Sequence, residues 1–181
     1  IVPLLSPAGV RVVRGTSRTI CDIWLCKELE VTGEKPEGNA RYPLREGQLV
    51  GAIHFPRSGS DIRDQRIEKG TYTLRYARIP VDGDHQGVSP NPDFLLAVLG
   101  EVDTVPTDIA VVDLKKKSAD TVGTDHPGSF SLAPLEGDDK APSIRHDEAG
   151  DFWIVRLQTT AKTEGKTRDL ALDLVVVGTA E

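Results

Sequence analysis

Two extended segments with contrasting hydrophobic patterns lie in the middle of the chain, on either side of a polar loop. Residues 71–79 (TYTLRYARI) alternate with a period of two, which predicts a half-buried strand. Its hydrophobic face comprises Tyr72, Leu74 and Tyr76, and its other face Thr73, Arg75 and Ala77. Residues 94–99 (FLLAVL) are apolar throughout, which is typical of a strand covered on both faces. We therefore expect both segments in one sheet, with the second lying deeper.

Similar patterns predict further strands along the whole chain. The expected strands cover residues 10–13, 18–29, 48–55, 143–147, 152–161 and 167–177, with a short one after the polar loop 123–134. The sequence TEGK at 163–166 predicts a hairpin turn between the last two strands. The segment 143–147 is expected to pair across residues 148–150. In the strand 48–55, Gly51 leaves room for another backbone to approach.

One segment favours a helix, at residues 108–118. Thr107 or Asp108 is suited to be its N-cap. The three lysines 115–117 would then lie at its C-terminal end, where positive charge is favoured. Many short strands with one brief helix predict an all-β fold. We expect a single antiparallel β-sandwich domain over residues 1–181, with jelly-roll or C2-like Greek-key topology and one short helix near 108–118.

Composition narrows the classes of partner. A chain of 181 residues is long enough for one domain with a sizeable core. Its net charge of −6 argues against nucleic acid, whose binding requires a basic surface. No apolar run approaches the length of a membrane-spanning helix, about 20 residues. The expected partners are therefore other protein subunits or further copies of the chain.

The two cysteines and the two tryptophans are expected to be core residues. Cys21 and Cys26 lie in one predicted strand at an odd spacing, which places them on opposite faces and about 16 Å apart. Two buried thiols follow from this geometry, and a disulfide would need a bulge between them. Trp24 and Trp153 each lie within a strand pattern, so a core position is favoured over a sugar-binding platform.

The beginning of the chain suggests export and a route to self-association. The sequence starts at Ile1 and contains no methionine, which favours a secreted protein whose signal peptide has been removed over a trimmed chain. The segment IVPLL is apolar and is interrupted by a proline, so it forms either an edge strand or an arm. An arm could add to the sheet edge of a neighbouring molecule. The residues expected to mediate this contact are Ile1, Val2, Leu4 and Leu5.

Several motifs in combination resemble a group of uncharacterised exported bacterial β-sandwich proteins. They are ICxIW (20–24), GxYxLRY (70–76), DGxHxG (82–87), DFLL (93–96) and GTxHP (123–127). The similarity covers about residues 18–135, and Ala97 departs from a third leucine in the DFLL motif. The resemblance implies a periplasmic or extracellular location and a sandwich fold, but it implies no activity.

The polar loop 82–93 carries the residues with the most evident chemistry. Read as a calcium loop, it has Asp82, Asp84 and Gln86 at positions one, three and five, and Asp93 at position twelve. Gly87 occupies the turn position, as a calcium loop requires. Two prolines in its second half and the lack of flanking helices favour instead a loop whose aspartates bind backbone N–H groups. No cofactor is therefore expected, and Ca²⁺ is the alternative if the loop binds a metal ion.

Two histidines in polar loops form a second candidate site. His85 and His126 each follow an aspartate, and Asp125 precedes the latter. If the two loops meet, the histidines could bind a metal ion or act as an acid/base pair. Histidines that donate to backbone carbonyls are the favoured alternative, because no zinc-ligand spacing is present. The nucleophile motif GxSxG is also absent from the sequence.

These observations lead to one expected function and two alternatives. We expect a non-enzymatic exported β-sandwich that serves as a structural or protein-interaction module, such as a subunit of a periplasmic or extracellular assembly. The first alternative is a carbohydrate- or Ca²⁺-binding module that uses the 82–93 loop. The second is a metal-dependent enzyme centred on His85 and His126.

Overall fold

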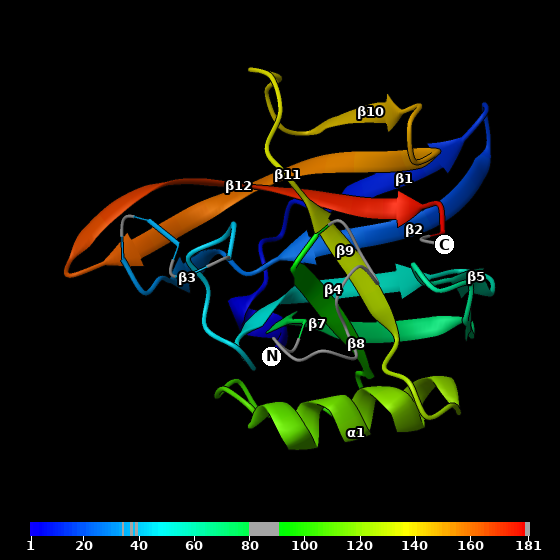
Figure 1. Cartoon of the computed structure of the whole chain (residues 1–181), viewed down its shortest axis with the longest axis horizontal. Helices are drawn as coiled ribbons and strands as arrows, with labels where there is room; N and C mark the ends of the chain where they lie inside the picture. The colour runs from blue at the N-terminus through cyan, green and yellow to red at the C-terminus, as the bar shows by residue number, and fades with distance from the viewer. Residues whose placement is uncertain (34, 37, 39, 80–90, 180–181) are drawn as a thin grey trace.

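The computed structural model describes residues 1–33, 35–36, 38, 40–79 and 91–179, which fold mainly into β-strands (Figure 1). The elements are η1 (Val2–Leu4), β1 (Val10–Arg14), β2 (Arg18–Leu25), β3 (Glu28–Glu30), β4 (Leu49–Phe55), β5 (Gly59–Ser60), β6 (Arg66–Ile67), β7 (Gly70–Arg78), β8 (Asp93–Leu99), α1 (Val111–Val122), β9 (Ser129–Ala133), β10 (Ser143–Asp147), β11 (Phe152–Thr163) and β12 (Lys166–Val177).

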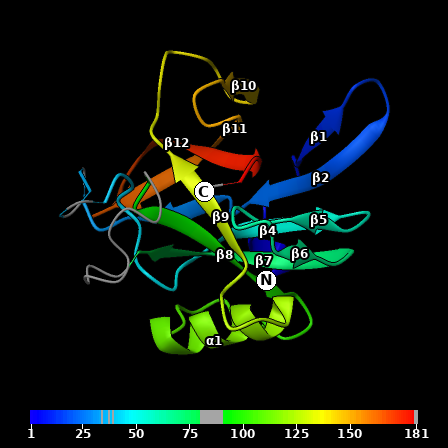
Figure 2. The same ribbon diagram turned by 45° about the vertical axis from the view of Figure 1, so that its right-hand side comes forward.

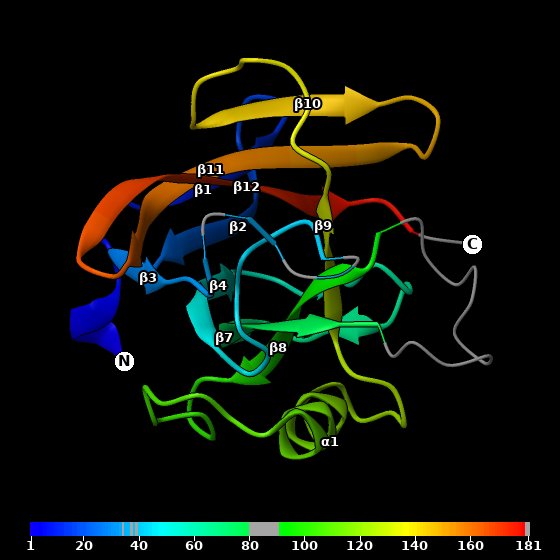
Figure 3. The ribbon, with the colours of Figure 1, turned by 60° about the vertical axis from the view of Figure 1, so that its left-hand side comes forward.

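Ten strands form one curled sheet in the order β1-β2-β4-β7-β8-β9-β12-β11-β10, with β3 added to β11. The β3–β11 pairing is parallel and all other pairings in this sheet are antiparallel. β9 pairs with both β12 and β8 and passes from the layer of one to that of the other (Figure 2). β3 follows β2 closely and pairs with β11, which joins the β1-β2-β4 side of the sheet to the β12-β11-β10 side (Figure 3). The prediction of an all-β, single-domain fold is confirmed, in a sandwich or barrel-like form.

Apolar side chains fill both sides of this sheet. The inner face encloses a core to which β7 contributes Tyr72, Leu74 and Tyr76. On the outer face, α1 covers β8, and Leu114 packs with Leu96 and other outer residues. β7 is also buried on both faces, so the prediction of a half-buried strand is wrong. The sequence pattern of β7 could not indicate this, because its outer face is covered by the distant segment 103–107, which binds Thr73 and Arg75.

The helix starts three residues later than expected. Its N-cap is Ala110, which makes no side-chain capping bond, and its C-cap is Gly123 in the left-handed conformation. Asp108 instead pairs with Arg45, with 2.9 Å between Oδ2 and Nε, and Ile109 N donates to Gly47 O. These contacts hold the preceding segment outside the helix. The lysines at 115–117 therefore lie in the middle of α1, and the prediction that they mark its C-terminal end is wrong.

The hairpins near the end of the chain match their predictions. β11 and β12 pair from Thr163↔Lys166 onward through a two-residue turn, in which Glu164 and Gly165 have φ of 45° and 80°. β10 pairs with β11 across the predicted turn. At Gly51, an added Cβ would collide with the carbonyl oxygen of Trp24, which confirms the expected close approach of two backbones.

The strand predicted at 18–29 is interrupted at Cys26 and Lys27. At these two residues the chain bonds to the N-terminal segment. Lys27 N donates to Leu4 O, and Leu5 forms an isolated bridge with Cys26. Both Cys21 and Cys26 are free and buried, as predicted.

Two aromatic side chains lie where the sequence pattern did not place them. Trp153 is 42% exposed and stacks on His146, so its predicted core position is wrong. Tyr42 lies in a stretch rich in charged residues, glycine and proline, at 30–46, yet its side chain is fully enclosed. Its hydroxyl donates to Ala133 O and accepts from Asp173 N, which bridges β9 and β12. The segment 40–44 is therefore part of the core rather than a surface wrap.

Candidate functional site

Only one of the proposed calcium ligands lies among the described residues. Asp82, Asp84 and Gln86, and also His85, lie outside them. Asp93 is fully buried at the start of β8. Its Oδ2 accepts from Arg41 N at 2.9 Å and its Oδ1 from the Tyr76 hydroxyl. Burial raises the pKa of Asp93, and these hydrogen bonds act against that rise. Both carboxylate oxygens thus hold the 41–42 segment and β7 to β8.

The second predicted pair lies in a solvent-exposed turn. Asp125 and His126 are exposed, and the turn is closed by Thr124, whose Oγ1 donates to His126 O at 2.8 Å. Within the described part of the chain, no three side chains of histidine, cysteine, aspartate or glutamate are grouped so that they could hold a metal ion.

The N-terminal segment folds back on its own chain. Ser6 N donates to Leu25 O at 2.8 Å, and Lys27 Nζ donates to Pro3 O at 2.9 Å. Ile1 and Leu5 pack against the inner core. Val2 and Leu4 remain exposed, at 79% and 44%. Of the four residues expected to mediate self-association, two therefore face solvent.

Two arginines on the outer face use every N–H donor within the protein. Arg75 and Arg156 each bind one buried aspartate through two donors and backbone carbonyls through the other three. Arg75 binds Asp103 and the carbonyls of Gly47, Val105 and Thr107. Arg156 binds Asp173 and the carbonyls of Glu136, Gly137 and Asp139. These arginines fasten loops to the sheet and have no donor left for a ligand.

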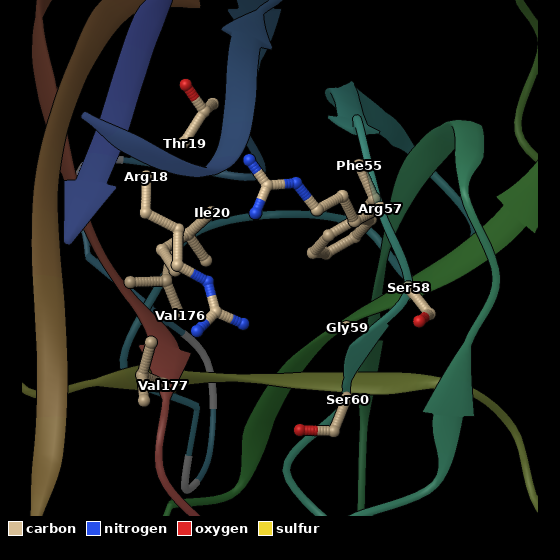
Figure 4. A pocket seen from close by; sticks show the side chains of 10 residues that line it. All are labelled: Arg18, Thr19, Ile20, Phe55, Arg57, Ser58, Gly59, Ser60, Val176 and Val177. Atoms are coloured by element: carbon tan, nitrogen blue, oxygen red, sulfur yellow. The ribbon is translucent and has the colours of Figure 1, made fainter.

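A pocket of about 140 Å³ opens at one end of the curled sheet. It is lined by residues 18–20 of β2, by Phe55 of β4, by residues 57–60 leading into β5, and by residues 176–177 of β12 (Figure 4). In Figure 1, the end of β12, the β1–β2 turn and β5 lie on the same side of the molecule. We call this space the arginine pocket, because Arg18 and Arg57 both extend into it (Figure 4).

The walls of the arginine pocket are held by the surrounding sheet. Phe55 stacks on Phe130 at 6.0 Å between ring centroids, and its ring packs against Gly59, where a Cβ would approach it to 3.0 Å. Next to Ser60, the buried Asp61 accepts from the backbone N of Arg63 and of Ser129, each at 2.9 Å. Asp61 thereby ties the β5–β6 hairpin to β9. Thus one side of the pocket is fixed before any ligand arrives.

The chemistry of the pocket combines positive charge and an apolar floor. Arg18 and Arg57 supply guanidinium groups, and Thr19, Ser58 and Ser60 also line the pocket. Ile20, Phe55 and Val176 form the apolar part, of which Phe55 and Val176 are buried. Guanidinium groups suit an anionic oxygen ligand.

Neither arginine of the pocket forms an ion pair with a carboxylate among the described residues. Arg14 lies directly opposite Arg18 in the β1–β2 pairing, so two like charges share one face of the hairpin. Directly opposed like charges destabilise an antiparallel pair. Arg14, Arg18 and Arg57 form no ion pair with any residue that the structure describes. In a chain of net charge −6, three arginines thus lie at this end of the sheet with no ion pair to any described carboxylate.

The sequence pattern did not identify this site. Its only local signal is RGTSR at 14–18, where a three-residue turn brings two arginines opposite each other. Arg57 is remote in sequence, and its approach to Arg18 depends on the register of β2 against β4, in which Asp22 pairs with His54.

No protein-family model matches this sequence, and neither does a curated protein or a solved structure. Among the described residues, no helix is both long and apolar enough to cross a lipid bilayer.

Proposed function

We propose that this protein is a non-enzymatic, exported interaction module that recognises an anionic group on its partner with the arginine pocket. The observation that carries the proposal is the convergence of Arg18 and Arg57 on one pocket without a carboxylate partner among the described residues. Guanidinium groups held together without counter-charge repel one another, and an incoming anion relieves that repulsion. The buried polar groups of Arg75, Arg156 and Asp93 are bound to other parts of the chain. Among the described residues, the arginine pocket therefore offers the clearest set of donors for a ligand.

The location of the pocket suits contact with a partner. It lies at an open end of the sheet, and both arginines are exposed. Positive charge at such a site attracts an anionic group and speeds its association. The attraction is sensitive to salt, because exposed charges are screened over a Debye length of about 8 Å at physiological ionic strength. Binding through the pocket should therefore weaken as salt is raised.

Calorimetry with small organic anions at low ionic strength tests this proposal. Wild-type protein should bind an anionic probe, and Arg18→Gln and Arg57→Gln should each weaken binding by about tenfold to a hundredfold, since a hydrogen bond to a charged group contributes about 1.5–3 kcal/mol. Lys116→Gln removes the same charge from the exposed surface of α1 and should leave binding within about twofold. Equal effects of all three variants, or no binding by wild type, would contradict the proposal.

Self-association through the N-terminal segment is a second candidate. It is favoured by one observation: Val2 and Leu4 are exposed apolar residues in an ordered turn. Light scattering on the chain with Val2→Ser and Leu4→Ser tests it. If the segment mediates assembly, the double variant is monomeric at concentrations where the wild type is a dimer or larger. A monomeric wild type ends this alternative without affecting the arginine pocket.

A further inference from the structure

We infer that the group recognised by the arginine pocket is a phosphate monoester, a tetrahedral dianion carried on an organic substituent. This inference rests on the proposed function and names its ligand class. It is drawn from three properties of the pocket: the number of donors, the amount of positive charge, and the small volume beside an apolar wall.

The donors in the pocket exceed what a carboxylate can accept. Arg18 and Arg57 each carry a fork of five N–H donors, and three hydroxyl side chains line the same space. A carboxylate has two oxygens with about four lone-pair sites. A phosphoryl group offers three strongly accepting oxygens directed to different sides, so that both guanidinium groups can donate to it at once. The approach of Arg18 from β2 and Arg57 from the segment after β4 suits such a group (Figure 4).

The charge near the pocket favours a dianion. Arg18 and Arg57 extend into it, and Arg14 lies opposite Arg18 on the adjacent strand. A phosphate monoester carries a charge of about −1.5 to −2 at neutral pH. A carboxylate or a sulfate monoester carries a single negative charge and would leave the repulsion among the arginines less completely relieved. Bidentate pairing of arginine with phosphate adds to this preference.

The volume limits how much of the ligand is enclosed. A space of about 140 Å³ is close to that of a cavity of about 150 Å³ that holds a benzene ring, so it suits one group of phosphoryl size. The organic substituent must then lie at the rim. Val177 lines the pocket and pairs with Trp153 on β11, whose ring is 42% exposed and stacked on His146 at 4.6 Å. An apolar or ring-shaped substituent can lie along this surface from Val177 to Trp153.

Titration with three probes of matched substituent tests the inference. Phenyl phosphate, phenyl sulfate and benzoate are added separately at pH 7.5 and constant ionic strength, with binding followed by calorimetry and by tryptophan fluorescence. We expect phenyl phosphate to bind at least about tenfold more tightly than the other two, and this difference to disappear in Arg18→Gln and Arg57→Gln. Trp153→Phe should abolish the fluorescence response and weaken phenyl phosphate more than inorganic phosphate. Lys116→Gln serves as the control for loss of net charge.

The outcomes separate this inference from the function on which it rests. Equal affinity for benzoate and phenyl phosphate, lost in the arginine variants, would overturn the phosphate assignment and keep anion recognition. Equal affinity for phenyl sulfate would overturn the need for a dianion. Failure of all three probes, or binding that the arginine variants leave unchanged, would overturn both. Both variants should retain the fold, because Arg18 and Arg57 are exposed and make no ion pair within the described residues. Circular dichroism and the urea midpoint of each variant check this.

Discussion

Arg75 and Asp103 form an ion pair with neither side chain exposed to solvent, with 2.6 Å between Nε and Oδ2 and 2.9 Å between Nη2 and Oδ1. Thr73 Oγ1 donates to the same carboxylate at 2.5 Å. The pair joins the outer face of β7 to the segment that leads into α1. Removing two charges from water costs free energy, and the complete set of hydrogen bonds to the pair offsets that cost.

Removing one partner of this pair should be strongly destabilising. In Arg75→Met, Asp103 is left as a buried charge and three carbonyls lose their donor, so we expect the free energy of unfolding to fall by about 3–5 kcal/mol. Urea unfolding followed by tryptophan fluorescence measures this change. Arg66→Met removes an exposed pair with Glu68 and should cost less than about 1 kcal/mol. Similar losses in the two variants would show that the buried pair has no special role.

Arg156 should control the order of the loop that it binds. Arg156→Lys keeps the charge but cannot reproduce a fork that reaches Asp173 and three carbonyls together. We expect faster amide hydrogen exchange in residues 136–142 and a loss of about 2–3 kcal/mol in stability. Mass spectrometry after exchange localises the effect. Arg11→Lys, in an ion pair at the other edge of the sheet, should leave exchange in this loop unchanged.

A methyl group at position 51 should be poorly tolerated. The Cβ of Gly51→Ala would meet the Trp24 carbonyl, which is backbone and cannot rotate away, so β2 and β4 must separate. We expect a loss of about 1–3 kcal/mol or more, measured as a lower melting temperature and urea midpoint. Gly33→Ala is the matched control, because its Cβ would lie 3.8 Å from the nearest atom. Equal behaviour of the two variants would contradict the close packing of these strands.

Because both thiols are buried, we expect the protein to lose stability at alkaline pH. Burial raises the pKa of Cys21 to about 12 and that of Cys26 to about 11, from an ordinary value of 9.0. Above pH 9 the thiols of the unfolded chain lose protons while those of the folded chain keep them, so unfolding becomes more favourable as pH rises. Each thiol contributes at most about 1.4 kcal/mol per pH unit in this range.

Cys21→Ala isolates this contribution. The variant should be less stable than wild type at pH 8 because it loses core volume, but its further loss between pH 8 and pH 10.5 should be smaller. Urea midpoints at the two pH values give the comparison. The raised pKa of Tyr72 acts in the same direction in both proteins and cancels in the difference. Parallel pH profiles for wild type and variant would contradict the effect of thiol burial.

Local patterns predicted those parts of the fold that local forces determine. The β11–β12 hairpin was predicted because a glycine-containing turn lies between two runs of alternating residues, and both signals depend only on neighbours in sequence. The strand at 94–99 was predicted because a short all-apolar run is typical of a strand that is covered on both faces. In contrast, the helix start at Val111 was missed, because Arg45 and Gly47, more than 60 residues earlier, bind Asp108 and Ile109.

The amino-acid sequence by itself determined an all-β domain, the position of most strands and the burial of both cysteines, because side-chain period and turn residues act over a few positions. Only the tertiary structure decided that Arg75 is enclosed by the distant segment 103–107, and that Arg18 and Arg57 line one pocket. An isolated arginine in a strand pattern looks the same in both situations. Whether it becomes a structural tie or a binding residue depends on which carboxylates and carbonyls the folded chain brings to it, and that is a property of tertiary packing.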